Sequence, residues 1–290
     1  MIRLRFHILD VFAEKKYAGN QLAVVESFGA LNDDAMLDIS REFNFSETTF
    51  IQAREPGENG WPVRIFTPAG EVPFAGHPTL GTAWIIREEL LKGTSEEIVL
   101  DLFAGTIPVT FRGDDAEMTQ LPPVFGSRVD HAGAAEVLGI DESDIRVDLP
   151  IQIVSTGLPF LITPLADLDA VARCRVDTPL LRDFVKDLDA KLFFVFTDHA
   201  EHSENQIRAR MFGHYYDVPE DPATGSAAGC LAGYLKKHAV LGEGEVFARI
   251  EQGFEMGRPS ILTISAREEG GEMLIRVAGR VIKTAEGFLT

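Results

Sequence analysis

The spacing of apolar and polar positions predicts a mixture of strands and helices in the first half of the chain. Apolar runs bounded by glycine, asparagine or proline predict strands at residues 3–12, 22–25, 46–52 and 63–67. Asn32 is a typical N-cap for a helix over residues 32–42, with acidic residues in its first turn, where the helix dipole favours them. A loop rich in proline and glycine follows at residues 71–79, and a second helix is expected to continue through residue 91.

The second half of the chain repeats this order of elements. A predicted strand at residues 206–212 leads into a proline- and glycine-rich loop and then into a helix of small residues that ends near His238. Arg64-Ile-Phe corresponds to Arg210-Met-Phe, and Gly76-His77 corresponds to Gly225-Ser226. Further strands are expected at residues 158–164, 247–250, 260–265 and 273–281.

Such a repeat indicates two related α+β lobes. The expected boundary lies near Pro122-Pro123, with an N-terminal lobe over residues 1–122 and a C-terminal lobe over residues 123–279. Residues 280–290 are a candidate segment for completing the N-terminal lobe.

Composition narrows the class of protein. An apolar fraction of 45% in 290 residues excludes a wholly disordered chain, and a net charge of −18 disfavours a broad nucleic-acid surface. Cys174 and Cys230 are too few for a disulfide scaffold or a thiolate-rich metal site. The first residues lack the apolar core of a signal peptide, and no segment approaches the roughly 18 apolar residues of a membrane span. A soluble, cytoplasmic protein with no membrane or nucleic-acid partner is expected.

The two proline- and glycine-rich loops each end where a helix begins. Free backbone N–H groups and the positive end of the helix dipole attract a carboxylate or phosphate at such a point. Gly76 and Gly225 permit a close approach of ligand to backbone. A pair of such helices, one from each lobe, would form an anion site at the lobe interface. The alternative is that both are ordinary buried helices with a glycine near the start.

Three residues close to these loops could transfer protons: Glu47, His77 and Asp221. Phe45 and Phe50 flank Glu47, so partial desolvation would let its carboxyl group both take up and return a proton. The presence of each residue can also be explained without a catalytic role. Glu47 would then be a solvent-facing strand residue, His77 a helix cap and Asp221 part of an Asx turn, although Glu220-Asp221 places two carboxylates before a helix start.

Other chemistries fit the sequence poorly. His199 and His202 have no third ligand at a convincing spacing, so a solvated loop is favoured over a metal site. Neither a dinucleotide-binding glycine motif nor a phosphate-binding loop is present, and Ser226 does not lie in a nucleophile elbow. No lysine has a marked pyridoxal context. Proton chemistry without a metal or cofactor is therefore expected.

Several short motifs, taken together, match one known family. They are residues 10–12 (DVF), 19–20 (GN), 44–50 (NFSETTF), 64–68 (RIFTP), 73–79 (PFAGHPT), 156–159 (TGLP) and 220–227 (EDPATGSA). Because these motifs follow one another along nearly the whole chain, the sequence resembles the phenazine-biosynthesis PhzF-type proteins, relatives of diaminopimelate epimerase.

The resemblance implies a fold and a set of site residues. The fold would be two similar lobes, each a curved, barrel-like mixed β-sheet around one central helix, with the active site between them. Glu47 would be the general acid and base. His77, Asp221 and Ser226 match the family's other active-site positions, and the expected substrate-binding residues are Asn20, Ser46, Gly76, Thr224 and Gly225.

The epimerase branch of this superfamily uses two cysteine thiols, one at each central-helix start. Here the corresponding stretches contain no cysteine, since Cys230 lies about one turn into the second helix and Cys174 lies elsewhere. The resemblance instead implies a cofactor-independent isomerase that moves a proton on a small, carboxylate-bearing, amino-acid-like or unsaturated ring substrate. Two alternatives stay open: a metabolite- or protein-binding member without catalysis, and a racemase or epimerase that uses carboxyl and histidine. Members of this family tend to form homodimers, so the resemblance also implies a homodimer.

Overall fold

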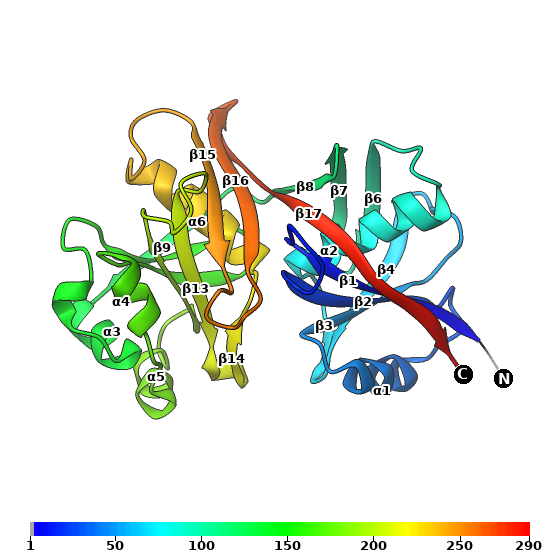
Figure 1. The fold of residues 1–290 in the computed structure, drawn as a ribbon, viewed down its shortest axis with the longest axis horizontal. Coiled ribbons are helices and arrows are strands. Elements are labelled where there is room, and N and C mark those ends of the chain that lie inside the picture. The colour runs from blue at the N-terminus through cyan, green and yellow to red at the C-terminus, as the bar shows by residue number, and fades with distance from the viewer. Residues whose placement is uncertain (1–2) are drawn as a thin grey trace. The chain divides into compact units, whose positions relative to one another are not determined.

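A computed structural model of the chain describes residues 3–290 and divides it into two compact units. Unit 1 comprises Met1–Thr119 together with Ala278–Thr290, and unit 2 comprises Gln120–Val277. Helices and strands of both units are labelled in Figure 1. Among residues 3–290, no helix has the length and apolar character needed to cross a membrane.

The strands of unit 1 close into a barrel. In order around the barrel they are β1 (Leu4–Val11), β2 (Asn20–Glu26), β3 (Glu47–Ile51), β4 (Trp61–Thr67), β6 (Glu97–Leu102), β7 (Gly105–Arg112), β8 (Asp115–Gln120) and β17 (Glu272–Leu289). The ring closes because β17 pairs with both β8 and β1. The β2–β3 and β4–β6 pairs are parallel, whereas β1 pairs antiparallel with β17 and β2, and the β3–β4, β6–β7 and β7–β8 pairs are antiparallel, so the sheet is mixed. The short strand β5 (Gly70–Val72) pairs with β4.

Helix α2 (Gly76–Ile85) is the central helix of unit 1. It contacts β1, β2, β3, β6 and β7, and nearly all of its residues are buried. Gly81 allows this packing, because a Cβ atom there would lie 2.5 Å from the side chain of Leu22. The predicted helix does extend through this region, but its last turn is the π-helix η1 (Ile86–Leu90).

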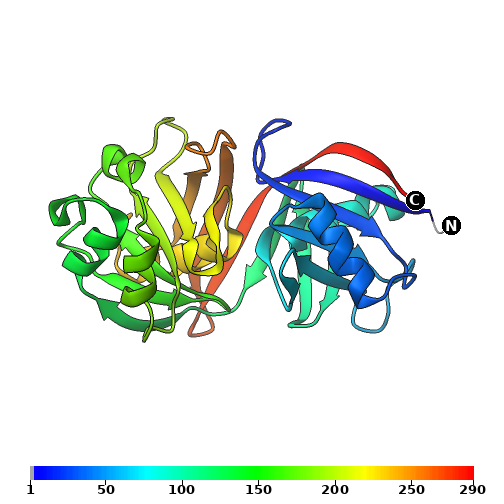
Figure 2. The same cartoon turned by 90° about the horizontal axis from the view of Figure 1, so that it is seen from below.

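Helix α1 (Asp33–Phe43) covers the outer side of the barrel of unit 1, against β3 and β4 (Figure 2). The predicted cap is confirmed, since the side chain of Asn32 accepts a hydrogen bond from the Ala35 amide at 3.0 Å. The helix ends at Asn44, whose φ of 54° is left-handed. Its apolar face buries Met36 in a cluster that includes Phe50 and Phe66.

Unit 2 repeats this plan with a curved sheet. Its strands are β9 (Val124–Val129), β10 (Ile151–Ser155), β11 (Pro159–Pro164), β12 (Leu192–Thr197), β13 (Ile207–Gly213), β15 (Val246–Gln252) and β16 (Ser260–Glu269), paired in that order. The β11–β12 and β13–β15 pairs are parallel, and the short strand β14 (Val218–Asp221) pairs with β13. The central helix α6 (Gly225–Lys237) contacts β10 and β11 as well as β15 and β16, so the sheet curves around it. The predicted α+β fold, with barrel-like sheets around central helices, is confirmed.

Three short helices pack on the other face of this sheet (Figure 1). They are α3 (His131–Leu138), α4 (Leu168–Arg173) and α5 (Thr178–Phe184), and single turns form η2 (Glu142–Asp144) and η3 (His214–Tyr216). Their apolar side chains share one core with residues of β10 to β13, such as Leu161 and Phe193. None of these helices was expected from the sequence pattern, because their apolar stretches are too short to show a clear helical period.

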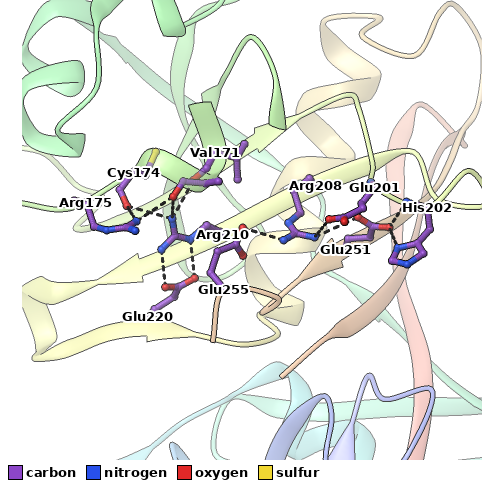
Figure 3. Close-up of polar contacts among 11 residues, drawn as sticks. Val171, Cys174, Arg175, Glu201, His202, Arg208, Arg210, Glu220, Glu251 and Glu255 are labelled. Carbon is purple, nitrogen blue, oxygen red and sulfur yellow. Dashed lines mark hydrogen bonds and ion pairs between the residues drawn. The ribbon is translucent and has the colours of Figure 1, made fainter. Parts of the chain in front are cut away.

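In each unit, one arginine–glutamate pair stabilises the loop before the central helix. In unit 1, Arg64 on β4 donates from Nε and Nη2 to the two carboxylate oxygens of Glu71, at 2.7 and 2.6 Å. In unit 2, Arg210 on β13 binds Glu220 on β14 in the same two-pronged manner, both at 2.8 Å (Figure 3). The sequence correspondence between the two halves therefore extends to the anchoring of these loops.

Candidate active site

Glu47 and His77 lie side by side in unit 1. Glu47 is the first residue of β3 and His77 is the second residue of α2, and the His77 Nε2 atom lies 3.5 Å from the Glu47 Oε2 atom. The side chain of Glu47 is 19% exposed and that of His77 is 6% exposed. Glu47 is therefore a largely buried carboxyl group beside an imidazole, which excludes the solvent-facing strand position considered above.

A second contact ties the strand of Glu47 to the helix of His77. The hydroxyl groups of Thr49 on β3 and Thr82 on α2 share a hydrogen bond of 2.7 Å, and both side chains are buried. Because this bond lies within the sheet–helix interface, it fixes the position of β3 along α2. The geometry of the Glu47–His77 pair thus depends on the packing of regular elements, which position side chains more accurately than loops do.

His77 is a neutral imidazole at physiological pH. Burial lowers the pKa of His77 to about 3, and a hydrogen bond to the backbone of Gln21 opposes this effect only in part. The Asn20 side-chain amide lies 3.2 Å from Nδ1 and orients the ring. Although the Glu47–His77 distance is within the range of an ion pair, the low pKa means that a carboxyl group here faces an uncharged ring. His77 does not cap the helix, since the N-cap position belongs to Ala75.

The other predicted site residues of unit 1 are Asn20, Ser46 and Gly76. Asn20 begins β2 and is buried, and β2 runs parallel to β3 with Leu22 opposite Glu47. Gly76 opens α2. Ser46 directly precedes β3 and is exposed. Asn20, Glu47 and His77 therefore form a contact group, with Gly76 next to His77 in the chain.

In unit 2, Asp221 and Thr224 form the turn that leads into α6. Asp221 ends β14, and its Oδ2 atom accepts a hydrogen bond of 2.5 Å from the Thr224 hydroxyl. Both residues are buried, Gly225 opens the helix, and Ser226 follows as a half-buried second residue. Only Asp221 of the expected carboxylate pair approaches the helix start, because Arg210 binds both oxygens of Glu220.

The starts of the two central helices differ from those of the other α-helices in the described chain. The side chains of Asn32, Asp130, Asp167 and Asp177 accept a hydrogen bond from the first turns of α1, α3, α4 and α5 respectively. In the N-cap positions of α2 and α6, neither Ala75 nor Thr224 provides such a bond. Thr224 instead directs its hydroxyl proton to Asp221. The N-cap residues of α2 and α6 therefore supply no capping side chain to the first turns of these helices.

Gln252 is a residue of this region that the sequence analysis missed. It is fully buried at the end of β15 and hydrogen-bonds to both Asp221 and Thr224. It lies 28 residues from Thr224 in the chain. The available signal was the polar pair Glu251-Gln252 at the end of an apolar strand, where both side chains prove to be fully buried.

The candidate metal ligands are a cluster at His7, Glu89 and Glu286 and the histidines His199 and His202. Within residues 3–290, ligand atoms of His7, Glu89 and Glu286 lie within 4.8 Å of one another. Both carboxylates already contact the cations Arg5 and Lys283, so their negative charge is balanced by side chains of this chain. Of the two other histidines considered above, His202 lies 2.9 Å from Glu251 through Nδ1.

Neither cysteine is poised to act as a nucleophile. Cys174 and Cys230 are both fully buried. Burial raises the pKa of the Cys174 thiol to about 12 and that of the Cys230 thiol to about 11. Since the thiolate is the reactive form, both side chains are protonated and inert near neutral pH.

Comparisons with known proteins identify the family of the chain. The family model described as phenazine biosynthesis-like protein, PhzC-PhzF, matches residues 9–287. A trans-2,3-dihydro-3-hydroxyanthranilate isomerase from Pseudomonas aeruginosa is 34% identical over 291 residues, covering 98% of each chain. An uncharacterized isomerase from Mesorhizobium japonicum is 32% identical over 293 residues, covering 97% of each chain. The crystal structure of a PhzF-family phenazine biosynthesis protein from Bacillus anthracis has the same fold, with a TM-score of 0.91, 24% identity and full coverage of both chains. The chain belongs to the PhzC-PhzF family of phenazine biosynthesis-like proteins and is an isomerase of that family.

Proposed function

We propose that the protein isomerises a small carboxylate-bearing substrate, amino-acid-like or an unsaturated ring, with Glu47 as the single general acid and base. The observation that carries this proposal is the Glu47–His77 pair, in which a largely buried carboxyl group faces a neutral imidazole at 3.5 Å. A single carboxyl group can take up a proton and later return it, which is the general acid–base role that this reaction requires.

In the proposed reaction, the Glu47 carboxylate removes a proton from a substrate carbon. The electrons of the broken C–H bond form a new double bond, and the existing double bond shifts along the ring. The protonated Glu47 then delivers the same proton to the carbon at the far end of the shifted system. Atoms and electrons balance without an oxidant, a reductant or a transferred group, so residues of this chain suffice. General acid–base catalysis typically contributes ~10²–10⁴-fold, and positioning must supply the rest.

His77 and Asp221 have supporting parts in this proposal. Because the pKa of His77 is about 3, the ring acts near neutral pH through hydrogen bonding and not through a positive charge. Asp221, held by Thr224, would stabilise or relay charge on the substrate. Ser226, Ser46 and Asn20 are the proposed polar contacts for the rest of the molecule.

The substrate carboxylate is proposed to bind the backbone amides at Gly76-His77 or Gly225-Ser226. Support comes from the two central helices, which lack the capping side chain that α1, α3, α4 and α5 possess. Uncapped N–H groups at the positive end of a helix dipole favour a carboxylate. The name of the P. aeruginosa relative makes trans-2,3-dihydro-3-hydroxyanthranilate the first compound to test, since it is a carboxylate on an unsaturated, amino-substituted ring.

A racemase that uses carboxyl and histidine in place of thiols is the second candidate. Two-base racemisation needs one base and one protonated acid on opposite faces of the substrate carbon. Here the histidine is unprotonated at neutral pH and lies within 3.5 Å of the carboxyl group, which disfavours that arrangement. Binding without catalysis is the third candidate, and the same experiment separates all three.

The test follows the substrate by proton NMR in D₂O with wild-type protein, E47Q and the control E42Q. Glu42 is an exposed residue of α1, so E42Q should turn over like the wild type. Movement of the double bond in the wild type, lowered at least 100-fold in E47Q, supports the proposal. Deuterium at a stereocentre without movement of the double bond would indicate a racemase. A rise in melting temperature with no exchange would indicate binding alone.

Wild-type turnover by E47Q would contradict the assignment of Glu47. If the named compound neither reacts nor binds, the same three proteins are tested against a set of small unsaturated amino acids, with melting temperature as the first screen. In that case the substrate assignment is wrong, whereas the role of Glu47 is judged on whichever compound reacts.

A further inference from the structure

Gln252 makes three hydrogen bonds to the turn that carries Asp221. Its Nε2 atom donates to the Asp221 backbone carbonyl at 2.8 Å and to the Thr224 hydroxyl oxygen at 3.1 Å. Its Oε1 atom accepts from the Thr224 backbone amide at 3.1 Å. A backbone carbonyl can only accept and a backbone amide can only donate, so these two partners fix which end of the Gln252 amide is which.

This orientation determines the direction of the next hydrogen bond. Because Nε2 can only donate, the Thr224 hydroxyl oxygen must accept from Gln252. The one hydroxyl proton of Thr224 is then directed to its other polar neighbour, the Asp221 Oδ2 atom, at 2.5 Å. The donor direction therefore runs from Gln252 through Thr224 to Asp221, and it ends on Oδ2 as an acceptor.

The residues directly before and after Gln252 are themselves constrained by their contacts and help to fix its position. The preceding residue, Glu251, is fully buried and accepts hydrogen bonds from the backbone amides of Glu201 and His202 and from Asn205. Figure 3 shows this cluster beside β13, where Arg208 also contacts Glu251. The following residue, Gly253, has a φ of 76°, and a Cβ atom there would lie 2.5 Å from the carbonyl oxygen of Pro222.

We propose that Gln252 is a positioning residue for the isomerase reaction. It acts through Thr224 to hold the Asp221 carboxyl group in place and to keep its Oδ2 atom a hydrogen-bond acceptor. This inference rests on the proposed function, in which Asp221 stabilises or relays charge on the substrate.

Two substitutions test the inference with little change in shape. In Q252E, an oxygen replaces the donor Nε2, so the Thr224 hydroxyl should turn to donate to residue 252 and release Asp221. In T224V, the hydroxyl is lost, while the backbone bonds from Gln252 to positions 221 and 224 can persist. T224S keeps the hydroxyl and should rescue function. The matched control is Q206E, because Gln206 also bonds to a strand amide, that of Arg249 on β15, but not to the Asp221 turn.

The kinetic arm measures kcat and KM for these variants with a substrate that the wild type converts. We expect kcat to fall at least tenfold in Q252E and T224V, with KM changed less than threefold. T224S should restore most of the kcat that T224V loses, and Q206E should keep both constants within twofold of wild type. The double variant Q252E/T224V should be no more than twofold slower than the slower single variant, because both act through one hydroxyl group. Independent, multiplying effects, or wild-type kcat in T224V, would overturn the inference.

The structural arm needs no substrate and so separates this inference from the proposed function. Crystal structures of the wild type and Q252E give the distance between Thr224 Oγ1 and Asp221 Oδ2. We expect this distance to exceed about 3.5 Å in Q252E, the limit of a hydrogen bond. An unchanged distance in an ordered Q252E turn would overturn the inference even if the enzyme is active. If the wild type proves inactive on every compound tested, the proposed function fails, and this distance alone decides whether Gln252 sets the turn.

Discussion

The Nε2 atom of His77 lies 3.5 Å from the Oε2 atom of Glu47, and burial holds the pKa of the histidine at about 3. A conventional ion pair would require a protonated ring, so this contact is one between a carboxyl group and a neutral imidazole. The consequence is twofold: the ring adds no positive charge to the site, and the folded protein resists protonation of a residue that the unfolded chain protonates readily.

The first prediction concerns stability in mild acid. An unfolded histidine has a pKa near 6.5, so between pH 6.5 and about 3 the unfolded chain binds a proton at residue 77 and the folded protein does not. Stability must therefore fall as the pH falls through this window, by about 1.4 kcal/mol per pH unit from this residue, and is unaffected by it above the window. Urea unfolding at pH 7.5 and 5 should show a loss about 2 kcal/mol smaller in H77Q than in wild type. H199Q is the control, because the His199 side chain is 65% exposed, and an equal loss in H77Q and wild type would contradict the assignment.

The second prediction compares the two arginine–glutamate pairs. Arg210 and Glu220 are largely buried, and Arg210 also donates to the backbone carbonyls of Val171 and Cys174 (Figure 3). Removing the guanidinium in R210M should lower the free energy of unfolding by about 3–5 kcal/mol, because a buried carboxylate loses its partner. The same change in the more exposed pair, R64M beside Glu71, should cost about 1 kcal/mol or less. Urea denaturation measures both values, and equal losses would show that burial does not set the strength of these pairs.

The third prediction concerns two glycines in one loop. Gly253 and Gly257 have φ angles of 76° and 69°, which are strained for any residue with a Cβ atom. Around Gly257 a Cβ atom would meet nothing within 4 Å, so G257A should cost roughly 1–2 kcal/mol from backbone strain alone. At Gly253 the added atom would lie 2.5 Å from the carbonyl oxygens of Pro222 and Arg258. G253A should therefore cost at least twice as much and also lower kcat, because Pro222 adjoins Asp221. Equal unfolding free energies in the two variants would contradict this reasoning.

The sequence allowed accurate prediction of elements with strong local signals. Asn32 caps α1 as expected, and the loops before α2 and α6 end at the predicted glycines. Strands β6 to β9, in contrast, were not predicted from the local pattern. The short helices α3, α4 and α5 were also missed, because tertiary packing and not their own periodicity stabilises them.

In the candidate site too, features with a local sequence signal were predicted and features that depend on tertiary packing were not. The positions of Glu47, His77 and Asp221 were predicted from motifs, and the structure brings Glu47 and His77 together within unit 1. The neutral state of His77 was not predicted, because it follows from the burial of the ring, which a helix-start position does not reveal. Gln252 was missed because its partners lie 28 or more residues away, on an element that joins the turn only in the folded unit.

The fourth prediction is that no thiol takes part in the reaction. Burial raises the pKa of Cys230 to about 11, and its Sγ atom lies 3.5 Å from the Thr156 hydroxyl and 3.6 Å from the Leu158 carbonyl oxygen, inside the unit 2 core. At pH 8, Ellman's reagent should modify neither Cys230 nor Cys174 in the folded protein within an hour, whereas both should react at once in 8 M urea. C230A should retain kcat within twofold, since a protonated, enclosed thiol can neither attack nor shuttle a proton. Rapid labelling of one thiol in the folded protein, with loss of activity in step, would contradict this prediction and revive thiol-dependent racemisation. Labelling without loss of activity would show only that the core around Cys230 or Cys174 opens more easily than its burial suggests.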